Sequence, residues 1–309
     1  MQLGCSSDAA RAAVRGRFPA PARDRFGGSR ARSRSVDSRR LTILDDILAT
    51  KRDEVTVLRY PQTRDLLRKT ALEAGPTRDF SSALRRPDDR VAVIGELKRR
   101  SPSKGDLAPD LDPGQVAKAY EAGGAAAISV LTDQPYFGGM VSDLQAAREA
   151  TTLPCLRKDF TIDEVQIYEA RAIGADAVLL IVVAIPDDAL LADLHALAIG
   201  LGMGVLVEAH DAREVERALN AGAQVVGINS RSLSTFAEDL GVATGLSGLL
   251  PPEVIAVAES AIRTIDDARR VAAAGFDAIL VGEALVRAED PTALVRDLAR
   301  VPVARRSAA

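Results

Sequence analysis

Short apolar stretches rich in β-branched residues recur along the chain from Val91 onward, and amphipathic segments separate them. This alternation is typical of a parallel sheet in which each strand is followed by a helix. Four similar phrases, AGGAAAISVL, IGADAVLLIV, AGAQVVGIN and AGFDAILVG, each predict a helix that ends at glycine before the chain re-enters the sheet. The pattern predicts eight strands, at residues 91–97, 126–131, 153–158, 177–183, 204–208, 225–229, 254–258 and 278–282.

Eight strand–helix units in about 220 residues indicate an α/β protein with a closed (β/α)8 barrel, the TIM barrel. A doubly wound sheet would carry a glycine-rich fingerprint after its first strand, and residues 96–100 contain no glycine. Ahead of the barrel, an apolar stripe with helical spacing runs through Leu41, Leu44, Ile47, Leu48, Val55 and Leu58. We therefore expect a single barrel domain over residues 41–309, with an extra N-terminal helical segment that covers one end of the barrel.

The first forty residues are rich in Arg, Ser, Ala and Gly and show no sustained apolar period. Such a segment cannot bury enough surface to offset the entropy lost on ordering, so we expect residues 1–40 to be a disordered leader. Three interpretations stay open: an organelle transit peptide, a nucleic-acid-binding tail, or a translated stretch upstream of the true start. A secretory signal peptide is excluded because the apolar segment it needs is missing.

The charge balance of the remaining chain argues against a nucleic-acid groove. The whole chain has a net charge of −3, but residues 1–40 hold ten arginines and three aspartates, which leaves 30 basic and 40 acidic residues in 41–309. An acidic body of this kind is unsuited to a phosphate backbone, although one basic pocket for a phosphorylated metabolite remains possible. We therefore expect no nucleic-acid partner.

The lengths of the apolar runs and the number of cysteines indicate in which compartment the protein works. The longest apolar run, residues 177–185, is far shorter than the roughly 18 to 20 residues of a membrane-spanning helix. Cys5 and Cys155 are too few for a disulfide framework, and no cysteine–histidine cluster has zinc-binding spacing. We expect a protein of a reducing compartment, the cytoplasm, with no membrane partner and no structural metal.

Charged and polar residues gather where the predicted strands end. In barrels the reactive groups lie at the carboxyl ends of the strands, and side chains two residues apart on a strand point to the same side. Burying lysines and glutamates together is costly unless they pair or perform chemistry, so the pattern predicts a mixed acid–base site at the barrel mouth. The residues at these ends are Glu96, Lys98, Lys158, Glu208, His210, Asn229, Arg231, Glu259 and Ser260.

Three loops are candidates for a phosphate site. Residues 101–105, read Ser-Pro-Ser-Lys-Gly, offer hydroxyls, amides and a cation after the first strand. Ser260–Ala261 and Gly282–Glu283 follow strands seven and eight, where barrels commonly hold phosphate on helix N-termini. Each loop alone also fits ordinary capping and turn roles for Ser and Gly.

Several segments, taken in order, resemble the indole-3-glycerol-phosphate synthase family over about residues 41–300. They are GELKRRSPSKG (95–105), ISVLTD (128–133), LPCLRKDF (153–160), GADAVLLIV (174–182), VEAH (207–210), GINSRSL (227–233), AESAI (258–262) and ILVGEALVR (279–287). The first and third are specific to that family among barrels, whereas GADAVLLIV and ILVGEALVR are closer to general barrel patterns.

The resemblance implies a carboxy-lyase of tryptophan biosynthesis that acts on 1-(2-carboxyphenylamino)-1-deoxyribulose 5-phosphate. Its reaction closes the indole ring with loss of carbon dioxide and water, and it requires no cofactor. Such a reaction needs an acid at the ribulose carbonyl and then an acid–base pair for dehydration. By this resemblance Lys158 is the general acid of condensation, and Lys98 contacts substrate and serves as an acid in dehydration. Glu208 is the catalytic glutamate, with Glu96 the other candidate base.

The same resemblance assigns the remaining site residues. Asn229 positions the substrate or Glu208, and Arg231 borders the ligand. The phosphate and substrate contacts fall to Ser101, Glu259, Ser260, Ala261, Gly282 and Glu283, and the anthranilate ring lies between Phe137, Phe160 and Leu233. Because a free lysine, with a pKa of about 10.4, donates a proton poorly near neutrality, we expect Lys98 and Lys158 to lower each other's pKa. The oligomeric state is not readable from the sequence.

The chain departs from the family's usual motifs at four positions, one of which is Ala209 in place of the usual Val between Glu208 and His210. Ala261 stands where the family usually has glycine, and if that amide must approach phosphate closely or take a positive φ, the methyl costs about 1 kcal/mol. Ser230 and Ser232 replace the usual Asn and Asp on either side of Arg231. These changes bear on affinity and rate more than on reaction class.

Other functions on the same fold stay open. One alternative is a specialised paralogue that serves a tryptophan-derived natural product, and another is a lyase in which a strand-end lysine forms a Schiff base. A third is a non-catalytic barrel that keeps the pocket as a sensor or scaffold. Intact Lys98, Lys158, Glu208 and Asn229 argue against the non-catalytic barrel. Phosphoribosylanthranilate isomerase is disfavoured because Glu96 and Lys98 replace the cysteine of its first strand.

Overall fold

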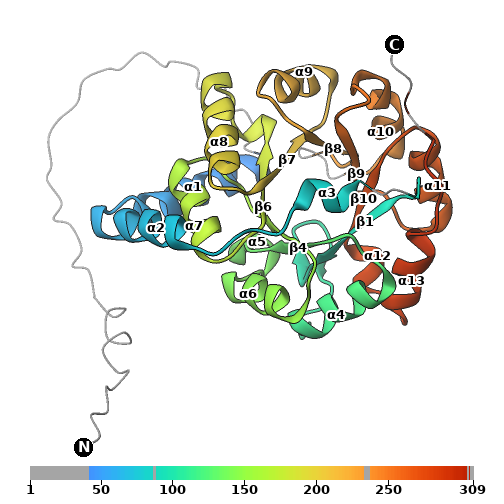
Figure 1. Cartoon of the computed structure of the whole chain (residues 1–309), viewed down its shortest axis with the longest axis horizontal. Coiled ribbons are helices and arrows are strands. Elements are labelled where there is room, and N and C mark those ends of the chain that lie inside the picture. Colours follow the sequence, from blue (N-terminus) through green and yellow to red (C-terminus); the bar gives the residue numbers. More distant parts are fainter. Residues whose placement is uncertain (1–41, 86–87, 233–236, 305, 307–309) are drawn as a thin grey trace, which may run out of the picture. The chain divides into compact units, whose positions relative to one another are not determined.

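The computed structural model describes residues 42–85, 88–232, 237–304 and 306 (Figure 1). The predictions about the leader, residues 1–40, and about Leu233 lie outside the described residues. The domain limits drawn from the sequence stay a prediction.

Eight parallel strands form a closed barrel, which confirms the predicted TIM-barrel fold. Each strand pairs with its neighbour in sequence, and β1 pairs with β10 to close the ring. Every predicted strand matches an observed one to within two residues at each end. The barrel strands are β1 (Ala92–Leu97), β4 (Ala127–Leu131), β5 (Cys155–Lys158), β6 (Ala177–Ile181), β7 (Gly204–Ala209), β8 (Val225–Asn229), β9 (Ile255–Glu259) and β10 (Ala278–Val281).

Helices alternate with the strands and surround them (Figure 1). The four glycines predicted to end helices, Gly124, Gly174, Gly222 and Gly275, all have left-handed backbones with φ between 88° and 93°, a conformation that costs glycine little. A two-stranded ribbon, β2 (Arg100–Ser101) and β3 (Gly105–Asp106), extends the loop after β1. The helices after β1 are α4 (Pro113–Gly123), α5 (Gln134–Phe137), α6 (Val141–Ala150), α7 (Glu164–Ala172), α8 (Asp188–Gly200), α9 (Ala212–Asn220), α10 (Leu240–Leu246), α11 (Ile265–Ala273), α12 (Glu283–Val286) and α13 (Pro291–Leu298), with short 3-10 turns at Val182–Ala184 and Ser247–Leu249.

Two apolar layers stabilise the barrel. One fills its interior, with buried side chains such as Ile94, Leu156, Leu206 and Leu280. The other lies between the sheet and the outer helices. Side chains that point inward and outward alternate along each strand. The inward-pointing charged residues at the strand ends therefore lie directly above the interior apolar layer.

Three helices precede the barrel: α1 (Ile43–Leu58), α2 (Pro61–Glu73) and α3 (Phe80–Leu84). Helix α1 begins with a capping box in which Thr42 and Asp45 satisfy each other's backbone amides, and α2 packs beside α7. Phe80 of α3 packs directly against Gly204, the first residue of β7, so closely that a Cβ added to Gly204 would collide with the Phe80 side chain. Helix α3 therefore closes the amino-terminal end of the barrel (Figure 1). The predicted extra helical segment is thus confirmed, and it contributes to both ends.

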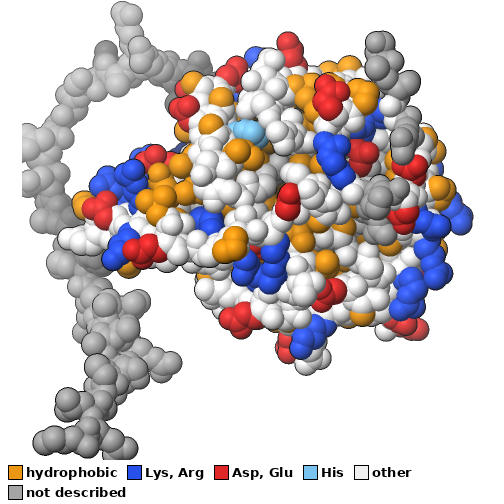
Figure 2. Space-filling model, in the orientation of Figure 1, with side chains coloured by type: hydrophobic (Ala, Val, Ile, Leu, Met, Phe, Trp, Pro, Cys, Tyr) orange, Lys and Arg blue, Asp and Glu red, His pale blue; other side chains and the backbone are white. Residues whose placement is uncertain are grey.

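Charges of both signs are dispersed over the face of the molecule drawn in Figure 2, where Lys and Arg side chains lie among Asp and Glu. Among the described residues, no helix has the length and apolar character needed to cross a membrane.

Candidate active site

A cavity open to solvent lies at the carboxyl ends of the barrel strands. Its floor is formed by charged residues of the strands, and Ile43, Leu44 and Ile47 of α1 form part of its wall. The end of the barrel covered by α1 is therefore the end at which barrel enzymes carry out their chemistry.

A cluster of two lysines and three glutamates lies at the bottom of this cavity. The Lys158 ammonium donates to Glu208 Oε2 at 3.3 Å and lies 3.5 Å from Glu259 Oε2. Lys98 Nζ lies 3.8 Å from Glu96 Oε1. All three glutamates are buried, and all five residues line the same cavity.

The two lysines differ in their proton affinity. Burial lowers the pKa of Lys98, and the positive charges of Arg231 and Lys158 lower it further against the opposing effect of Glu96. Burial also acts to lower the pKa of Lys158, but the carboxylates around it outweigh burial and raise the pKa above its ordinary value. The expectation of mutual lowering is therefore right for Lys98 and wrong for Lys158, because Lys158 has three facing carboxylates: Glu208, Glu259 and Glu96.

The glutamates also differ. Burial acts to raise the pKa of Glu208, but Lys158 and His210 outweigh it and hold the pKa below its ordinary value. For Glu259, burial and the nearby Glu208 raise the pKa well above its ordinary value. Glu208 is therefore held in its ionised form, while Glu259 gives up its proton less readily than Glu208 does.

Glu259, which the resemblance places among the substrate and phosphate contacts, lines the cavity. Its side chain is buried in the barrel interior, and its Oε2 atom lies 3.5 Å from Lys158 Nζ. Gly227 of β8 makes room for it: a Cβ at that position would lie 2.0 Å from Glu259 Oε1. The sequence contains a signal for this inward orientation. Side chains two residues apart on a strand point to the same face, and Glu259 comes two residues after Val257, whose side chain lies in the barrel interior.

Asn229 is held between Glu208 and the rim of the cavity. Its amide nitrogen donates to Glu208 Oε1 at 3.0 Å, and its Oδ1 accepts from Ser260 Oγ at 2.8 Å and from the Arg231 backbone N–H at 3.0 Å. His210 Nε2 lies 3.5 Å from the same oxygen, Glu208 Oε1. The other oxygen, Oε2, accepts from Lys158, so both oxygens of Glu208 are held.

The loops predicted to hold phosphate come together at the cavity rim. Ser101, Ser260, Ala261, Gly282 and Glu283 all line it. Ser260 and Ala261 have positive φ values of 64° and 59°, a conformation unusual for residues with a side chain. The carboxylate of Glu283 lies 2.7 Å from Lys104 Nζ.

Aromatic side chains form another part of the wall. The ring centroids of Phe137 and Phe160 are 6.2 Å apart with a 36° angle between the planes. Lys98 Nζ lies 5.7 Å from the centroid of the Phe137 ring. The Lys98 ammonium and the two aromatic rings are therefore adjacent.

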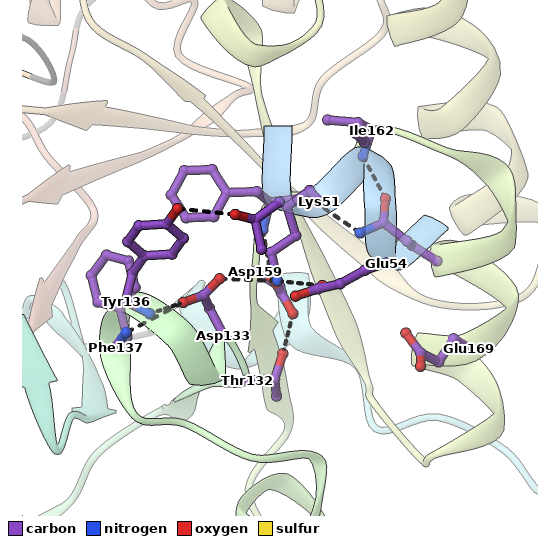
Figure 3. A network of polar contacts seen from close by, with 12 residues as sticks. Lys51, Glu54, Thr132, Asp133, Tyr136, Phe137, Asp159, Ile162 and Glu169 are labelled. Atoms are coloured by element: carbon purple, nitrogen blue, oxygen red, sulfur yellow. Dashed lines mark hydrogen bonds and ion pairs between the residues drawn. The ribbon is translucent and has the colours of Figure 1, made fainter. Parts of the chain in front are cut away.

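Sequence reasoning missed one polar network beside the site, shown in Figure 3. Lys51 of α1 is 2% exposed and pairs with Asp133 and Asp159, which follow β4 and β5. The signal was present in the sequence, since Lys51 lies four residues from both Ile47 and Val55 and so interrupts the apolar stripe of α1. Sequence reasoning also missed Glu238 and Arg263, which line the cavity near Arg231.

No group of three or more His, Cys, Asp or Glu side chains suited to a metal ion occurs within the described ranges.

Comparison with known proteins gives consistent matches over the barrel. The family model described as indole-3-glycerol phosphate synthase matches residues 44–298. An indole-3-glycerol phosphate synthase of Arthrobacter sp. (strain FB24) is 49% identical over 254 residues, covering 81% of this chain and 93% of the relative. The protein named indole-3-glycerol phosphate synthase 2 of Streptomyces coelicolor is 48% identical over 256 residues, covering 83% and 98%.

Solved structures with low sequence identity share the fold. The 3-hexulose-6-phosphate synthase of Salmonella typhimurium matches with a TM-score of 0.56 at 16% identity, over 68% of this chain and 98% of that one. This likeness bears on the barrel architecture alone.

Proposed function

The chain belongs to the indole-3-glycerol phosphate synthase family, and on that premise we propose roles for the individual residues of its cavity. The protein is a carboxy-lyase of tryptophan biosynthesis that converts 1-(2-carboxyphenylamino)-1-deoxyribulose 5-phosphate into indole-3-glycerol phosphate, carbon dioxide and water. The observation that carries the assignment of roles is the meeting of Lys98, Lys158, Glu96 and Glu208 in one cavity.

Condensation joins the aromatic carbon that bears the carboxylate to the ribulose carbonyl carbon. In our proposal the Lys158 ammonium faces the carbonyl oxygen, stabilises the developing negative charge and donates a proton to it. The carbon–carbon bond to the carboxylate then breaks, and its electron pair returns to the ring as carbon dioxide leaves. The carboxylates around Lys158 keep it protonated until substrate arrives.

Dehydration requires an acid and a base on the same intermediate. Lys98 has the lower pKa of the two lysines and is the better proton donor to the departing hydroxyl near neutrality. Glu208 is ionised and accepts the proton whose removal completes the indole ring. Glu96, buried 3.8 Å from Lys98, is the alternative base.

The rest of the cavity binds and orients the substrate. We assign the phosphate to the rim formed by Ser101, Ser260, Ala261, Gly282 and Glu283, with Arg231 at the ligand's border. Phe137 and Phe160 face the anthranilate ring. Asn229 holds Glu208 and the rim in register through its three hydrogen bonds.

The decisive test is direct turnover of the anthranilate–ribulose substrate by the purified chain. We expect indole fluorescence to appear and the product mass to lack carbon dioxide and water. Sodium borohydride added during turnover separates this mechanism from a Schiff-base lyase, because acid catalysis leaves no covalent adduct on lysine. No fluorescence at high enzyme concentration would contradict the proposal, and a trapped lysine adduct would replace it with the lyase.

A cytoplasmic location is also part of the proposal. It is supported by Cys155, whose thiol is buried and free of any disulfide.

A further inference from the structure

Lys51 is a buried cation that has no part in the reaction steps proposed above. It belongs to α1, outside the barrel, and is 2% exposed. Its ammonium lies 2.9 Å from Asp159 Oδ1, 3.0 Å from Asp133 Oδ2 and 2.8 Å from Glu54 Oε2 (Figure 3). Burial acts to lower the pKa of Lys51, but Asp159 and Asp133 outweigh it and raise the pKa, so the side chain stays charged. The fold does not need such a buried charge for its stability, because an apolar side chain that fills the same space often stabilises a protein equally well.

Asp133 links Lys51 to Phe137. The Oδ1 atom of Asp133 accepts the backbone N–H groups of Tyr136 at 2.9 Å and Phe137 at 3.3 Å, which caps α5. Its other oxygen faces Lys51. The orientation of α5, and with it the Phe137 ring, therefore depends on a carboxylate held by Lys51.

Asp159 links Lys51 to Phe160. The Oδ1 atom that faces Lys51 also accepts the backbone N–H of Phe160 at 2.8 Å, and Oδ2 accepts from Thr132 Oγ1 at 2.6 Å. Asp159 directly follows Lys158 in the chain. The ammonium thus contacts the carboxylate that fixes the backbone between Lys158 and Phe160.

Helix α1, which carries Lys51, is the third part of the cavity wall, after the segments with Phe137 and Phe160. Ile47, one turn before Lys51, lines the cavity, as do Ile43 and Leu44. A second polar contact, 3.0 Å between Thr50 Oγ1 and Tyr136 Oη, also joins α1 to α5. Three separate wall elements, carrying Ile47, Phe137 and Phe160, therefore meet at one ammonium group.

We propose that Lys51 is a positioning residue for the aromatic subsite of the cavity. It holds α1, α5 and the segment after β5 at the spacing that accepts a planar aminobenzoate ring, while the phosphate rim does not depend on it. This inference rests on the proposed placement of the anthranilate ring between Phe137 and Phe160.

The test compares Lys51→Met, Lys51→Arg and the surface control Lys69→Met. Lys69 lies on α2, its side chain is 70% exposed, and its ion pair with Glu73 is 3.9 Å long. We expect Lys51→Met to raise KM for the substrate about tenfold while kcat changes less than about threefold, the pattern of lost ground-state binding. Lys51→Arg, which keeps the charge, should recover most of the affinity, and Lys69→Met should match the wild type.

Two probes separate subsite effects from general loosening. Competitive inhibition by inorganic phosphate reports the rim and should stay within about twofold of the wild type in Lys51→Met. Titration with fluorescent 2-aminobenzoate reports the ring subsite without turnover and should weaken in parallel with KM. An unchanged KM, or an equal loss of phosphate and aminobenzoate affinity, would overturn the proposal.

A folding defect is separated by a second variant. Lys51→Met combined with Asp133→Asn removes one charge from each side of the network and keeps an oxygen that can cap α5. If circular dichroism shows that Lys51→Met does not fold, the double variant is measured instead. A folded double variant that binds aminobenzoate as tightly as the wild type would refute the proposal. An inactive wild type would count against the proposed function only, because aminobenzoate binding is measured independently of turnover.

Discussion

The Lys158 ammonium lies 3.3 Å from the Glu208 carboxylate, and each group holds the other in its charged form. Lys158 lowers the pKa of Glu208, and Glu208 raises the pKa of Lys158. The acid and the base of the proposed reaction are therefore ready before substrate binds, at the cost of a strong mutual dependence.

Replacing Lys158 by Met should lower kcat by about 100- to 10,000-fold, the usual contribution of a general acid. Substrate binding should persist, because the phosphate rim and the aromatic wall are separate from Lys158. Steady-state indole fluorescence measures turnover, and equilibrium titration measures binding. The exposed Lys118 of α4 gives the control variant Lys118→Met, which should turn over like the wild type; turnover retained in Lys158→Met would contradict the role of Lys158.

The barrel and most of the site could be predicted because their signals are local and periodic. The strand Val225–Asn229 is a short apolar run that ends in a polar residue, and the pattern predicts its observed limits. Adjacent parallel strands then bring Glu208 of β7 beside Asn229 of β8 without further information. Most charged residues at the strand ends therefore line one cavity, as the pattern predicts, whereas His210 is not among the lining residues.

What could not be predicted depends on distances across the fold. Lys158 and Lys98 have the same side chain and both lie at strand ends, yet their pKa values shift in opposite directions because only Lys158 faces three carboxylates. Lys51 pairs with Asp133, 82 positions away in the chain, through the packing of α1 against the barrel mouth. Sequence periodicity marks such residues as inward-facing but does not identify their partners.

The two histidines of the chain should give pH dependences of opposite sign. Burial acts to lower the pKa of His210, but Glu214, 2.9 Å from its Nδ1, and Glu208 outweigh burial and raise the pKa above 6.5. Burial lowers the pKa of His195 in α8 below 6.5. The stability that His210 contributes is fully present below pH 6.5 and is lost as the pH rises through its raised folded value. His195 instead destabilises the protein at low pH, and that penalty disappears as the pH rises toward 6.5.

Denaturant unfolding of His210→Asn and His195→Gln from about pH 5 to about pH 8.5 measures these contributions. Relative to the wild type, His210→Asn should lose most stability at the acid end, and His195→Gln should gain there. The same sign of change in both variants at acid pH would contradict the opposite shifts.

Replacing Ala261 by Gly should relieve a strained backbone at the phosphate rim. Ala261 has a φ of 59°, and its neighbour Ser260 has a φ of 64°. A left-handed alanine costs about 1 kcal/mol, which the greater entropy of an unfolded glycine partly offsets. We therefore expect a change in unfolding free energy within about 1 kcal/mol and tighter inhibition by inorganic phosphate.

The exposed Ala273 at the end of α11 provides the comparison. Its backbone is helical, so Ala273→Gly should lower stability by at most about 1 kcal/mol and leave phosphate inhibition unchanged. Weaker phosphate inhibition in Ala261→Gly would show that the methyl group does not hinder the rim.

Replacing Gly227 by Ala should displace Glu259 from the acid–base cluster. A Cβ at Gly227 would lie 2.0 Å from Glu259 Oε1 and 3.0 Å from its Cδ, so the carboxyl group must move. Overpacking of this kind costs about 1–3 kcal/mol, and denaturant unfolding measures it. Because Glu259 also faces Lys158 at 3.5 Å, kcat should fall with stability.

Shortening the displaced side chain tests whether Glu259 is the cause. The double variant Gly227→Ala with Glu259→Asp should recover most of the lost stability, since the two changes share one contact and should not be additive. Gly200 in α8 offers a matched glycine, because a Cβ added there would meet nothing within 4 Å, so Gly200→Ala should be neutral or stabilising by up to about 1 kcal/mol. A Gly227→Ala variant as stable as Gly200→Ala would mean that Glu259 can leave its position without cost, and that the interior of the barrel does not fix it beside Lys158.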